Sequence, residues 1–306
     1  MGVIGIDTSN YTTSIAFFDG TGGENCSKLL PVKSGELGLR QSDAVFAHIK
    51  SLPELSGRLF SHVREKITAV GVSTRPRAVE GSYMPCFLVG LSHATLLSDA
   101  LHVPLVEVSH QQGHVAASLW SAGHLELMDE PHLAWHLSGG TTELLLVEPE
   151  GKLVKCTKIG GTTDISAGQL IDRTGQLLGL PFPSGKHLDA LSREAAGKDF
   201  FRVKCTDMTF SFSGMQNKVQ QYFEANGDPA ETAAYALRCV AYGVFHATQQ
   251  ALKAYPGLPV VFSGGVASNT LLRQVLEPLN PIFAQPQYST DNAMGVAVLA
   301  SRCTEV

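Results

Sequence analysis

Residues 3–18 read Val3-Ile4-Gly5-Ile6-Asp7-Thr8-Ser9-Asn10-Tyr11-Thr12-Thr13-Ser14-Ile15-Ala16-Phe17-Phe18, two apolar runs on either side of a polar bend. This pattern predicts a β-hairpin whose bend carries the polar side chains. The second half of the chain repeats this pattern. An apolar run over residues 133–137 ends in Ser138-Gly139-Gly140, and residues 143–147 are expected to form the second strand of the hairpin. The repeated hairpin, followed each time by helices, predicts an α/β protein of the actin-like ATPase (ASKHA) kind, with two similar lobes and a nucleotide cleft.

The remaining periodicity completes this layout. Further strands are expected over residues 69–73, 105–108 and 260–262, and helices over residues 89–101, from His110 onward, and over 167–178, 230–254, 269–276 and 293–301. A chain of 306 residues accommodates two domains. We place the division near residues 128–131, with an N-terminal lobe over 1–129 and a C-terminal lobe over 130–306.

Composition narrows the class of protein. The formal net charge of −5 argues against a broad electrostatic footprint for nucleic acid, although it leaves room for a local basic groove. The six cysteines are scattered without a Cys-x-x-Cys pair, which fits reduced thiols and neither a zinc ribbon nor a redox motif. Neither a signal peptide nor an apolar segment long enough to cross a bilayer is evident, so we expect a cytoplasmic protein with no membrane contact.

Two histidines offer a metal site. His110 and His114 in Ser109-His110-Gln111-Gln112-Gly113-His114 are four residues apart, which places both imidazoles on one face of a helix. Asp291, in Thr290-Asp291-Asn292, could add a carboxylate. Two imidazoles and one carboxylate can bind a divalent ion and leave coordination positions open for phosphate or water. Iron, zinc, manganese and magnesium all remain candidates. The ordinary alternatives are a half-exposed helix face for the histidines and a helix N-cap for Asp291.

Two Ser-Gly-Gly turns offer a phosphate site. Each follows an apolar strand, at Ser138-Gly139-Gly140 and at Ser263-Gly264-Gly265, and glycine lets backbone N–H groups approach a phosphate closely. One such turn alone is explained by ordinary turn formation, whereas two of the same kind favour a nucleotide site. The chain has neither a Walker pattern nor G-x-G-x-x-G after its first strand, which argues against a P-loop or Rossmann fold.

Three residues could contact the nucleoside. A carboxylate at Asp172 could bond ribose hydroxyls, Gly185 could mark a close approach of backbone to ligand, and Asn269 could contact adenine or ribose. A surface charge, a turn and a helix start, respectively, explain the same residues without a ligand.

Short motifs lie in order along nearly the whole chain: Gly5-Ile6-Asp7-Thr8-Ser9, His110-Gln111-Gln112-Gly113-His114, Leu137-Ser138-Gly139-Gly140, Leu178-Gly179-Leu180-Pro181-Phe182-Pro183, Phe210-Ser211-Phe212-Ser213-Gly214, Gly264-Gly265-Val266-Ala267-Ser268-Asn269 and Thr290-Asp291-Asn292. In this combination the chain resembles the universal tRNA threonylcarbamoyladenosine transferases, the TsaD family, once described as O-sialoglycoprotein endopeptidases. The resemblance implies an actin-like fold, a divalent metal, and ATP or an ATP-derived adenylate. It also implies that a threonylcarbamoyl group moves from the adenylate to adenosine 37 of certain tRNAs.

The resemblance assigns roles to particular residues. It implies metal ligation by His110, His114 and Asp291, and Asp7 in the first bend is the candidate catalytic carboxylate. The nucleotide would be held by Leu137, Ser138, Gly139, Gly140, Thr141, Asp172, Gly185 and Asn269. Besides nucleotide and tRNA, the implied partners are TsaB-like and TsaE-like proteins, a small inactive homologue and an ATPase.

The chain departs from the family pattern near the first bend and the histidine motif. Asn10-Tyr11-Thr12 stands for the usual Cys-Asp-Glu, Gln112 for the Glu between the histidines, and Thr141 for a His. Residues 74–83 replace a Gly-Pro-Gly loop and bring Arg75 and Arg77, either a solvated loop or a contact for an anionic substrate. Two hypotheses follow: an active threonylcarbamoyl or carbamoyl transferase, or a divergent paralogue that binds nucleotide but acts on another substrate or has a regulatory role.

Two other classes of enzyme fit less well. A metalloprotease of the His-Glu-x-x-His type is not supported, because Gln112 removes the one acid between the histidines. A sugar kinase needs a carboxylate base opposite the γ-phosphate, for which Asp7 is the only obvious candidate.

Overall fold

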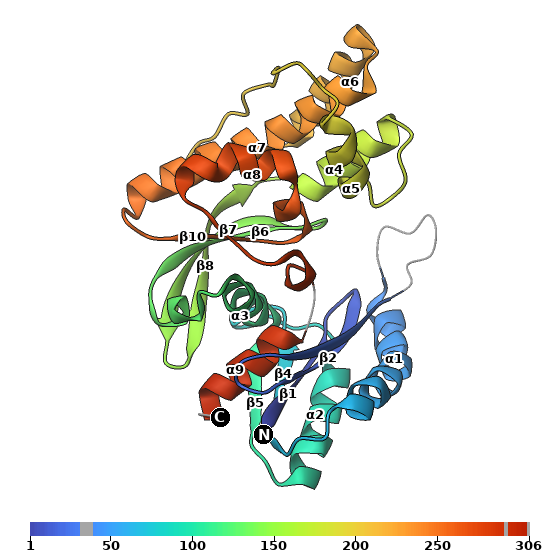
Figure 1. The fold of residues 1–306 in the computed structure, drawn as a ribbon, viewed down its shortest axis with the longest axis vertical. Coiled ribbons are helices and arrows are strands. Elements are labelled where there is room, and N and C mark those ends of the chain that lie inside the picture. The colour runs from blue at the N-terminus through green and yellow to red at the C-terminus, as the bar shows by residue number, and fades with distance from the viewer. Residues whose placement is uncertain (31–38, 291–292, 305–306) are drawn as a thin grey trace. The chain divides into compact units, whose positions relative to one another are not determined.

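The computed structural model describes residues 1–30, 39–290 and 293–304, which form two compact units (Figure 1). The first unit contains Met1–Glu130, Glu148–Cys156 and the C-terminal segment, and the second contains Pro131–Val147 and Thr157–Thr290. The sequence-based division at residues 129 and 130 stays a prediction about domains.

The first unit is built on a five-stranded sheet in the order β3-β2-β1-β4-β5. Its strands are β1 (Gly2–Thr8), β2 (Thr12–Phe18), β3 (Gly23–Leu29), β4 (Ile67–Arg75) and β5 (Leu105–Ser109). The first three strands form an antiparallel meander, and β4 and β5 then add in parallel to β1. The predicted hairpin is confirmed, with Ile6 opposite Ile15 and Thr8 opposite Thr13 around the polar bend.

Helices cover both faces of this sheet. They are α1 (Gln41–His62), α2 (Phe87–Leu101), α3 (His110–Ala122) and α9 (Met294–Thr304). Helices α1 and α2 pack on one face around Leu55 and Leu59, whereas α9, with α3 beside it, packs on the other (Figure 1). A side chain at Gly5 would lie 2.5 Å from the carbonyl oxygen of Ala293, so only glycine in β1 lets α9 approach so closely.

The second unit repeats the scheme. Its sheet has the order β11-β10-β6-β7-β8-β9, in which β6 and β7 are antiparallel while β10 and β11 run parallel to β6. The strands are β6 (His132–Leu137), β7 (Thr142–Glu150), β8 (Leu153–Thr162), β9 (Thr209–Phe210), β10 (Val260–Ser263) and β11 (Ile282–Phe283). The order β8-β7-β6-β10-β11 corresponds strand for strand to β3-β2-β1-β4-β5, which confirms the predicted repeat.

A long central helix organises the core of the second unit. The helices are α4 (Ala167–Leu177), α5 (Gly185–Ser192), α6 (Ser213–Asn226), α7 (Pro229–Ala254) and α8 (Thr270–Leu276). Asp228 caps α7 by accepting hydrogen bonds from the N–H groups of Ala230 and Glu231, and Pro229 occupies the first turn. The alanine-rich face of α7 lies against Trp135 and Phe262 of the sheet, and the Trp135 indole donates to the Thr248 hydroxyl at 2.9 Å.

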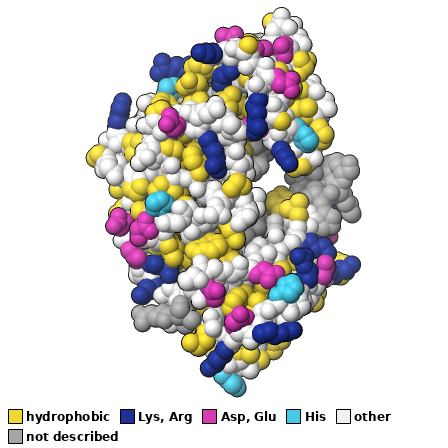
Figure 2. All heavy atoms as spheres, in the orientation of Figure 1, with side chains coloured by type: hydrophobic (Ala, Val, Ile, Leu, Met, Phe, Trp, Pro, Cys, Tyr) yellow, Lys and Arg dark blue, Asp and Glu magenta, His cyan; other side chains and the backbone are white. Residues whose placement is uncertain are grey.

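Short 3₁₀ helices complete the described chain: η1 (Leu125–Asp129), η2 (Gly265–Ser268), η3 (Glu277–Leu279) and η4 (Pro286–Tyr288). Within residues 1–30, 39–290 and 293–304, no helix is both long and apolar enough to span a bilayer. Figure 2 shows basic and acidic side chains both spread over the face in view, in keeping with the modest net charge.

Candidate metal and nucleotide sites

The start of α3 positions the two histidines. Ser109 caps α3, because its hydroxyl accepts from the Gln112 N–H at 3.2 Å while the Gln112 side-chain oxygen accepts from the Ser109 N–H at 2.9 Å. This capping box makes His110 the first residue of the helix, and His114 follows one turn later. Their Nε2 atoms lie 3.0 Å apart. The structure therefore brings together the two histidines that the sequence singled out.

A buried carboxylate stands behind the pair. Asp7, at the end of β1, has no exposed surface, and its Oδ1 lies 3.0 Å from Nδ1 of His110 and accepts a hydrogen bond from the Ser73 hydroxyl. A carboxylate that holds the Nδ1 proton leaves the Nε2 lone pair of His110 facing Nε2 of His114, and a carboxylate in this position is common behind metal-bound histidines. Sequence reasoning missed Ser73, because no local pattern in β4 distinguishes it from other strand residues.

The donor set fits a divalent ion. Each histidine presents its Nε2 atom to the other at 3.0 Å, and imidazole nitrogens are common ligands of divalent ions. Among the described residues, no three His, Cys, Asp or Glu side chains gather in a way that could hold a metal. The proposed third ligand, Asp291, lies outside the described residues.

Gln112 has a structural role that the sequence did not reveal. Its side chain is buried, and besides completing the capping box its Nε2 donates to the carbonyl oxygen of Val154 at 2.7 Å. The amide thereby ties α3 to the start of β8. A glutamate could complete the same capping box, but an ionised carboxylate could not donate to Val154.

A polar bridge connects the first bend to helix α1. Asn10 Oδ1 accepts from Gln41 Nε2 at 2.6 Å, and Gln41 Oε1 in turn accepts from the N–H of Cys86, next to the start of α2. Thr12 is buried at the start of β2, whereas Tyr11 is exposed. Asn10 therefore links the bend to α1.

Ionisable groups around Asp7 are strongly desolvated. His48 on α1 is fully buried and its Nδ1 lies 2.7 Å from the Thr13 hydroxyl. Burial lowers the pKa of His48, and a backbone hydrogen bond at Ser9 and the charge of Asp7 only partly oppose this. Burial, reinforced by the charge of Asp7, raises the pKa of the Cys86 thiol to about 11. The signal for His48 was its place in the apolar stripe of α1, but a single polar residue there is usually structural.

The arginine loop is attached to the histidine helix. Arg75 and Arg77 are both exposed, and between them the carbonyl of Pro76 accepts from the N–H of Gln111 at 3.0 Å. The two cations are thus held next to the first turn of α3.

The two Ser-Gly-Gly turns lie side by side in the second unit. Strands β6 and β10 are parallel neighbours, with His136 opposite Ser263, so both turns leave the same edge of the sheet. Gly264 has a φ of +89° and packs against Leu137 so closely that no side chain fits. Gly139 is exposed with open space around it, and Thr141 closes its turn through a hydrogen bond from its N–H to the Ser138 hydroxyl.

The N-terminus of α4 abuts the first of these turns. The hydroxyl of Ser166, which precedes α4, donates to the carbonyl of Gly139 at 2.6 Å, and a side chain at Gly168 would lie 2.4 Å from the Gly139 Cα atom. The N–H groups of a helix start and of a glycine turn therefore meet in one place, an arrangement that favours a phosphate.

The other nucleotide candidates lie between α4, α5 and α8. Asp172 Oδ1 accepts from the N–H of Ser184 at 2.8 Å, just before Gly185 begins α5. Burial raises the pKa of Asp172, and this hydrogen bond partly offsets the rise. Asn269 caps α8 through Leu272 and donates from Nδ2 to Asp189 Oδ1 at 2.7 Å. Asp172 and Asn269 thus also have structural contacts.

Solved structures with a similar fold span the whole chain. HypF from T. kodakarensis matches with a TM-score of 0.61 at 13% identity, covering 99% of this chain and 47% of HypF. A ROK family glucokinase from Streptomyces griseus, solved with glucose and AMPPNP, matches with a TM-score of 0.56 at 11% identity, covering 99% of this chain and all of the kinase. These neighbours confirm the predicted actin-like ATPase fold.

Sequence relatives identify the family. The family model of tRNA N6-adenosine threonylcarbamoyltransferase, TsaD, matches residues 39–298. The transferase of that name from Carboxydothermus hydrogenoformans is 31% identical over 96% of this chain and 90% of its own length. The one from Kosmotoga olearia is 34% identical over 70% of this chain and 66% of its own length, and for Lacticaseibacillus casei the match covers 61% of the relative. The chain belongs to the TsaD family.

Proposed function

We propose that the protein transfers a threonylcarbamoyl group from an ATP-derived adenylate to N6 of a tRNA adenosine. Family membership supplies the reaction class. The observation that carries the proposal is the array of Asp7, His110 and His114 in the first unit, in which a buried carboxylate orients one imidazole toward the other.

The histidine pair would hold a divalent ion, with Asp291 as the third protein ligand. When bound, the ion would supply Lewis acidity that offsets negative charge during the transfer. Asp7 Oδ1 lies 3.0 Å from Nδ1 of His110 and would hold its proton, so we assign Asp7 as a positioning residue. Ser73, which donates to the same carboxylate, keeps Asp7 in place.

Residues of the second unit would bind the nucleotide. The N–H groups of Gly139 and Gly140 and of the α4 N-terminus would bind the phosphate, while Leu137, Ser138 and Thr141 shape the turn and Asp172, Gly185 and Asn269 border the nucleoside. In the transfer, adenosine N6 forms a bond to the carbamoyl carbon. The bond from that carbon to the phosphate oxygen breaks with its electron pair on AMP, and the N6 proton goes to water. The amides would offset the negative charge that develops on the departing phosphate.

Metal uptake tests the proposed site. We expect His110→Ala combined with His114→Ala to abolish the bound metal found by elemental analysis of the purified protein, which also identifies the element. The matched control, His62→Ala with His124→Ala, removes two exposed histidines and should leave the stoichiometry unchanged. Unchanged metal in the first double variant would refute the site.

Complementation tests the reaction. We expect expression in cells that lack their own family enzyme to restore threonylcarbamoyladenosine in tRNA hydrolysates, together with the TsaB-like and TsaE-like proteins that the proposal includes as partners. The His110→Ala, His114→Ala variant should fail to restore it. Absence of the nucleoside with wild-type protein, when calorimetry shows that ATP still binds, would favour the alternative below.

The alternative is a divergent family member that binds nucleotide but acts on another substrate or regulates a partner. The replacement of family acids at Tyr11, Thr12 and Gln112, and of a cysteine at Asn10, favours it. The structural roles of Asn10 and Gln112 weigh against it, because both amides have contacts that account for their presence without a change of substrate.

A further inference from the structure

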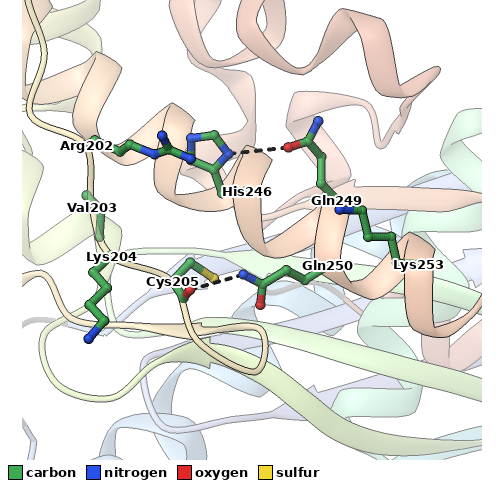
Figure 3. A pocket seen from close by; sticks show the side chains of 8 residues that line it. All are labelled: Arg202, Val203, Lys204, Cys205, His246, Gln249, Gln250 and Lys253. Atoms are coloured by element: carbon green, nitrogen blue, oxygen red, sulfur yellow. Dashed lines mark hydrogen bonds between the residues drawn. The ribbon is translucent and has the colours of Figure 1, made fainter.

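A basic hollow lies in the second unit, away from every residue assigned so far. It has a volume of about 420 Å³ and is formed between the segment 202–205 and the C-terminal half of α7. Its lining residues are Arg202, Val203, Lys204, Cys205, His246, Gln249, Gln250 and Lys253 (Figure 3). The lining thus contains three permanent cations and a histidine, and no carboxylate.

Backbone contacts hold the walls of the hollow in place. Gln250 on α7 donates from Nε2 to the carbonyl of Cys205 at 3.1 Å and accepts from the N–H of Met208 at 2.8 Å, so one side chain fastens the loop to the helix twice. Val203 is buried beneath the loop, while Arg202 and Lys204 on either side of it are exposed. In Figure 3 the Arg202 side chain extends toward His246, and Gln249 bonds to the same imidazole.

The positive charges in this hollow are not paired with carboxylates of the described chain. Across the described part of the chain, no carboxylate forms an ion pair with Arg202, Lys204 or Lys253. Like charges held near one another repel, and an anion that enters between them relieves the repulsion. A guanidinium group beside ammonium groups is the combination that proteins use for phosphate.

Aromatic side chains stand next to the cations. Phe200 and Phe201 immediately precede Arg202, and they are 37% and 42% exposed. Phe200 stacks on Tyr242 of α7, with ring centroids 4.1 Å apart and planes within 13°, so its ring is held in a fixed orientation. Tyr242 in turn lies 6.2 Å from the His246 ring that lines the hollow. Exposed aromatic rings beside a basic groove are typical of surfaces that bind single-stranded nucleic acid.

We propose that this hollow binds a phosphodiester of a single-stranded stretch of RNA, with a neighbouring base against Phe200. The choice of RNA rests on the proposed function, because the acceptor there is a tRNA. An acidic protein needs such a local basic site if it is to hold a polyanion. Asp207, in an adjoining hollow that shares Cys205, Gln250 and Lys253, limits how far a strand could extend in that direction.

Salt-dependent binding tests the inference. The full chain with Arg202→Gln, Lys204→Gln and Lys253→Gln is compared with wild type, using a fluorescein-labelled RNA stem-loop and anisotropy titrations at several salt concentrations. We expect affinity to fall about tenfold or more, and the slope of log affinity against log salt to become shallower by about 2, since each contact with a single strand contributes about 0.7. Phe200→Leu should weaken binding severalfold without changing the slope.

A charge-matched control separates a site from a general effect. Lys50→Gln, Lys66→Gln and Lys155→Gln remove three exposed cations from the first unit, so the change in net charge is the same. Equal losses in both triple variants would overturn the proposal, as would wild-type RNA affinity in the hollow variant. The hollow variant could instead lose the binding of inorganic phosphate that wild type shows and keep its RNA affinity. That result would identify the ligand as a small phosphate compound and would also overturn the proposal.

The test also separates this inference from the proposed function. RNA binding in the anisotropy assay does not require transfer, so wild-type protein that binds RNA through the hollow but never modifies it would contradict only the proposed reaction. The His110→Ala, His114→Ala variant should bind the stem-loop as wild type does. Because the substituted cations are exposed, thermal unfolding should match wild type and exclude loss of fold as the cause.

Discussion

At the residue scale, Gln112 shows how a departure from a family pattern can be misinterpreted. The sequence shows only that an acid is missing between two histidines. The structure shows an amide that completes a capping box with Ser109 and donates to Val154. The sequence could predict that His110 and His114 share a helix face, because their spacing is local. It could not predict the contact with Val154, which joins residues that are distant in the chain.

Gln112→Glu is expected to lower the free energy of unfolding by about 1–3 kcal/mol, because the buried carbonyl of Val154 would lose its donor and face a carboxylate. Denaturant unfolding at neutral pH measures this change. Gln111→Glu, one position earlier and partly exposed, adds the same charge and should change stability by less than about 0.5 kcal/mol. Equal stability of the two variants would show that the Val154 contact contributes nothing.

At the element scale, the helices that were predicted most closely from the sequence have a clear apolar period and a local cap. Helix α7 has both, and it was predicted to within a residue. Helix α1 was missed because Pro53 lies inside it and because His48 and Ser51 interrupt its buried stripe. Helix α6 was missed because only Met215 and Val219 are buried along it.

The start of α6 depends on a distant carboxylate. Asp164 accepts from the N–H groups of Phe212 and Ser213 and from the Ser211 hydroxyl, whereas Phe212, at the cap position, offers no side-chain acceptor. Partial burial raises the pKa of Asp164, but the hydrogen bonds from Ser211, Ser213 and Phe212 outweigh it and hold the pKa well below its usual value. A cap supplied from another part of the chain leaves no signature in the helix sequence itself.

Asp164→Asn should therefore cost about 1 kcal/mol of stability at neutral pH, because the amide oxygen still accepts hydrogen bonds but lacks the charge that strengthens them. The folded-state pKa is depressed, so the stabilisation is fully present above the unfolded value of about 3.9 and is lost as the pH falls toward the folded value. The difference between wild type and variant, measured by denaturant unfolding at several pH values, should shrink below about pH 4. Asp43→Asn, in the exposed first turn of α1, is the control, and a difference independent of pH would contradict the assignment.

At the scale of the whole molecule, the twofold repeat could be predicted from the sequence because each hairpin is a local pattern. That α9 belongs to the first unit could not be predicted from the sequence. That membership depends on Gly5 and Gly71, where side chains would collide with the carbonyl oxygens of Ala293, just before α9, and of Val296 within it. Glycines within strands have many explanations, and no pattern indicates which distant helix requires them. The position of Asp291 beside the histidines likewise stays a prediction.

Ala297→Asp tests how strongly the first unit depends on α9. Ala297 has no exposed surface, and its N–H would lie 2.6 Å from a side chain at Gly5, so a carboxylate there has neither room nor a partner. We expect amides of β1 and β4 to lose most of their protection from hydrogen exchange while those of α7 keep theirs. Ala254→Asp, at the exposed end of α7, is the control. Full protection of β1 in the Ala297 variant would contradict the dependence.

The packing of α9 on the sheet of the first unit has a consequence for folding during biosynthesis. Domains usually fold in the order in which they leave the ribosome, with the N-terminal one first. Here β1 is translated well before the helix that covers one face of its sheet, which spans Met294–Thr304. The second unit, made of residues 131–147 and 157–290, is available in full before that helix is translated. Until α9 emerges, one face of the sheet of β1 and β4 therefore stays uncovered and open to chaperones, even after the whole second unit has been translated.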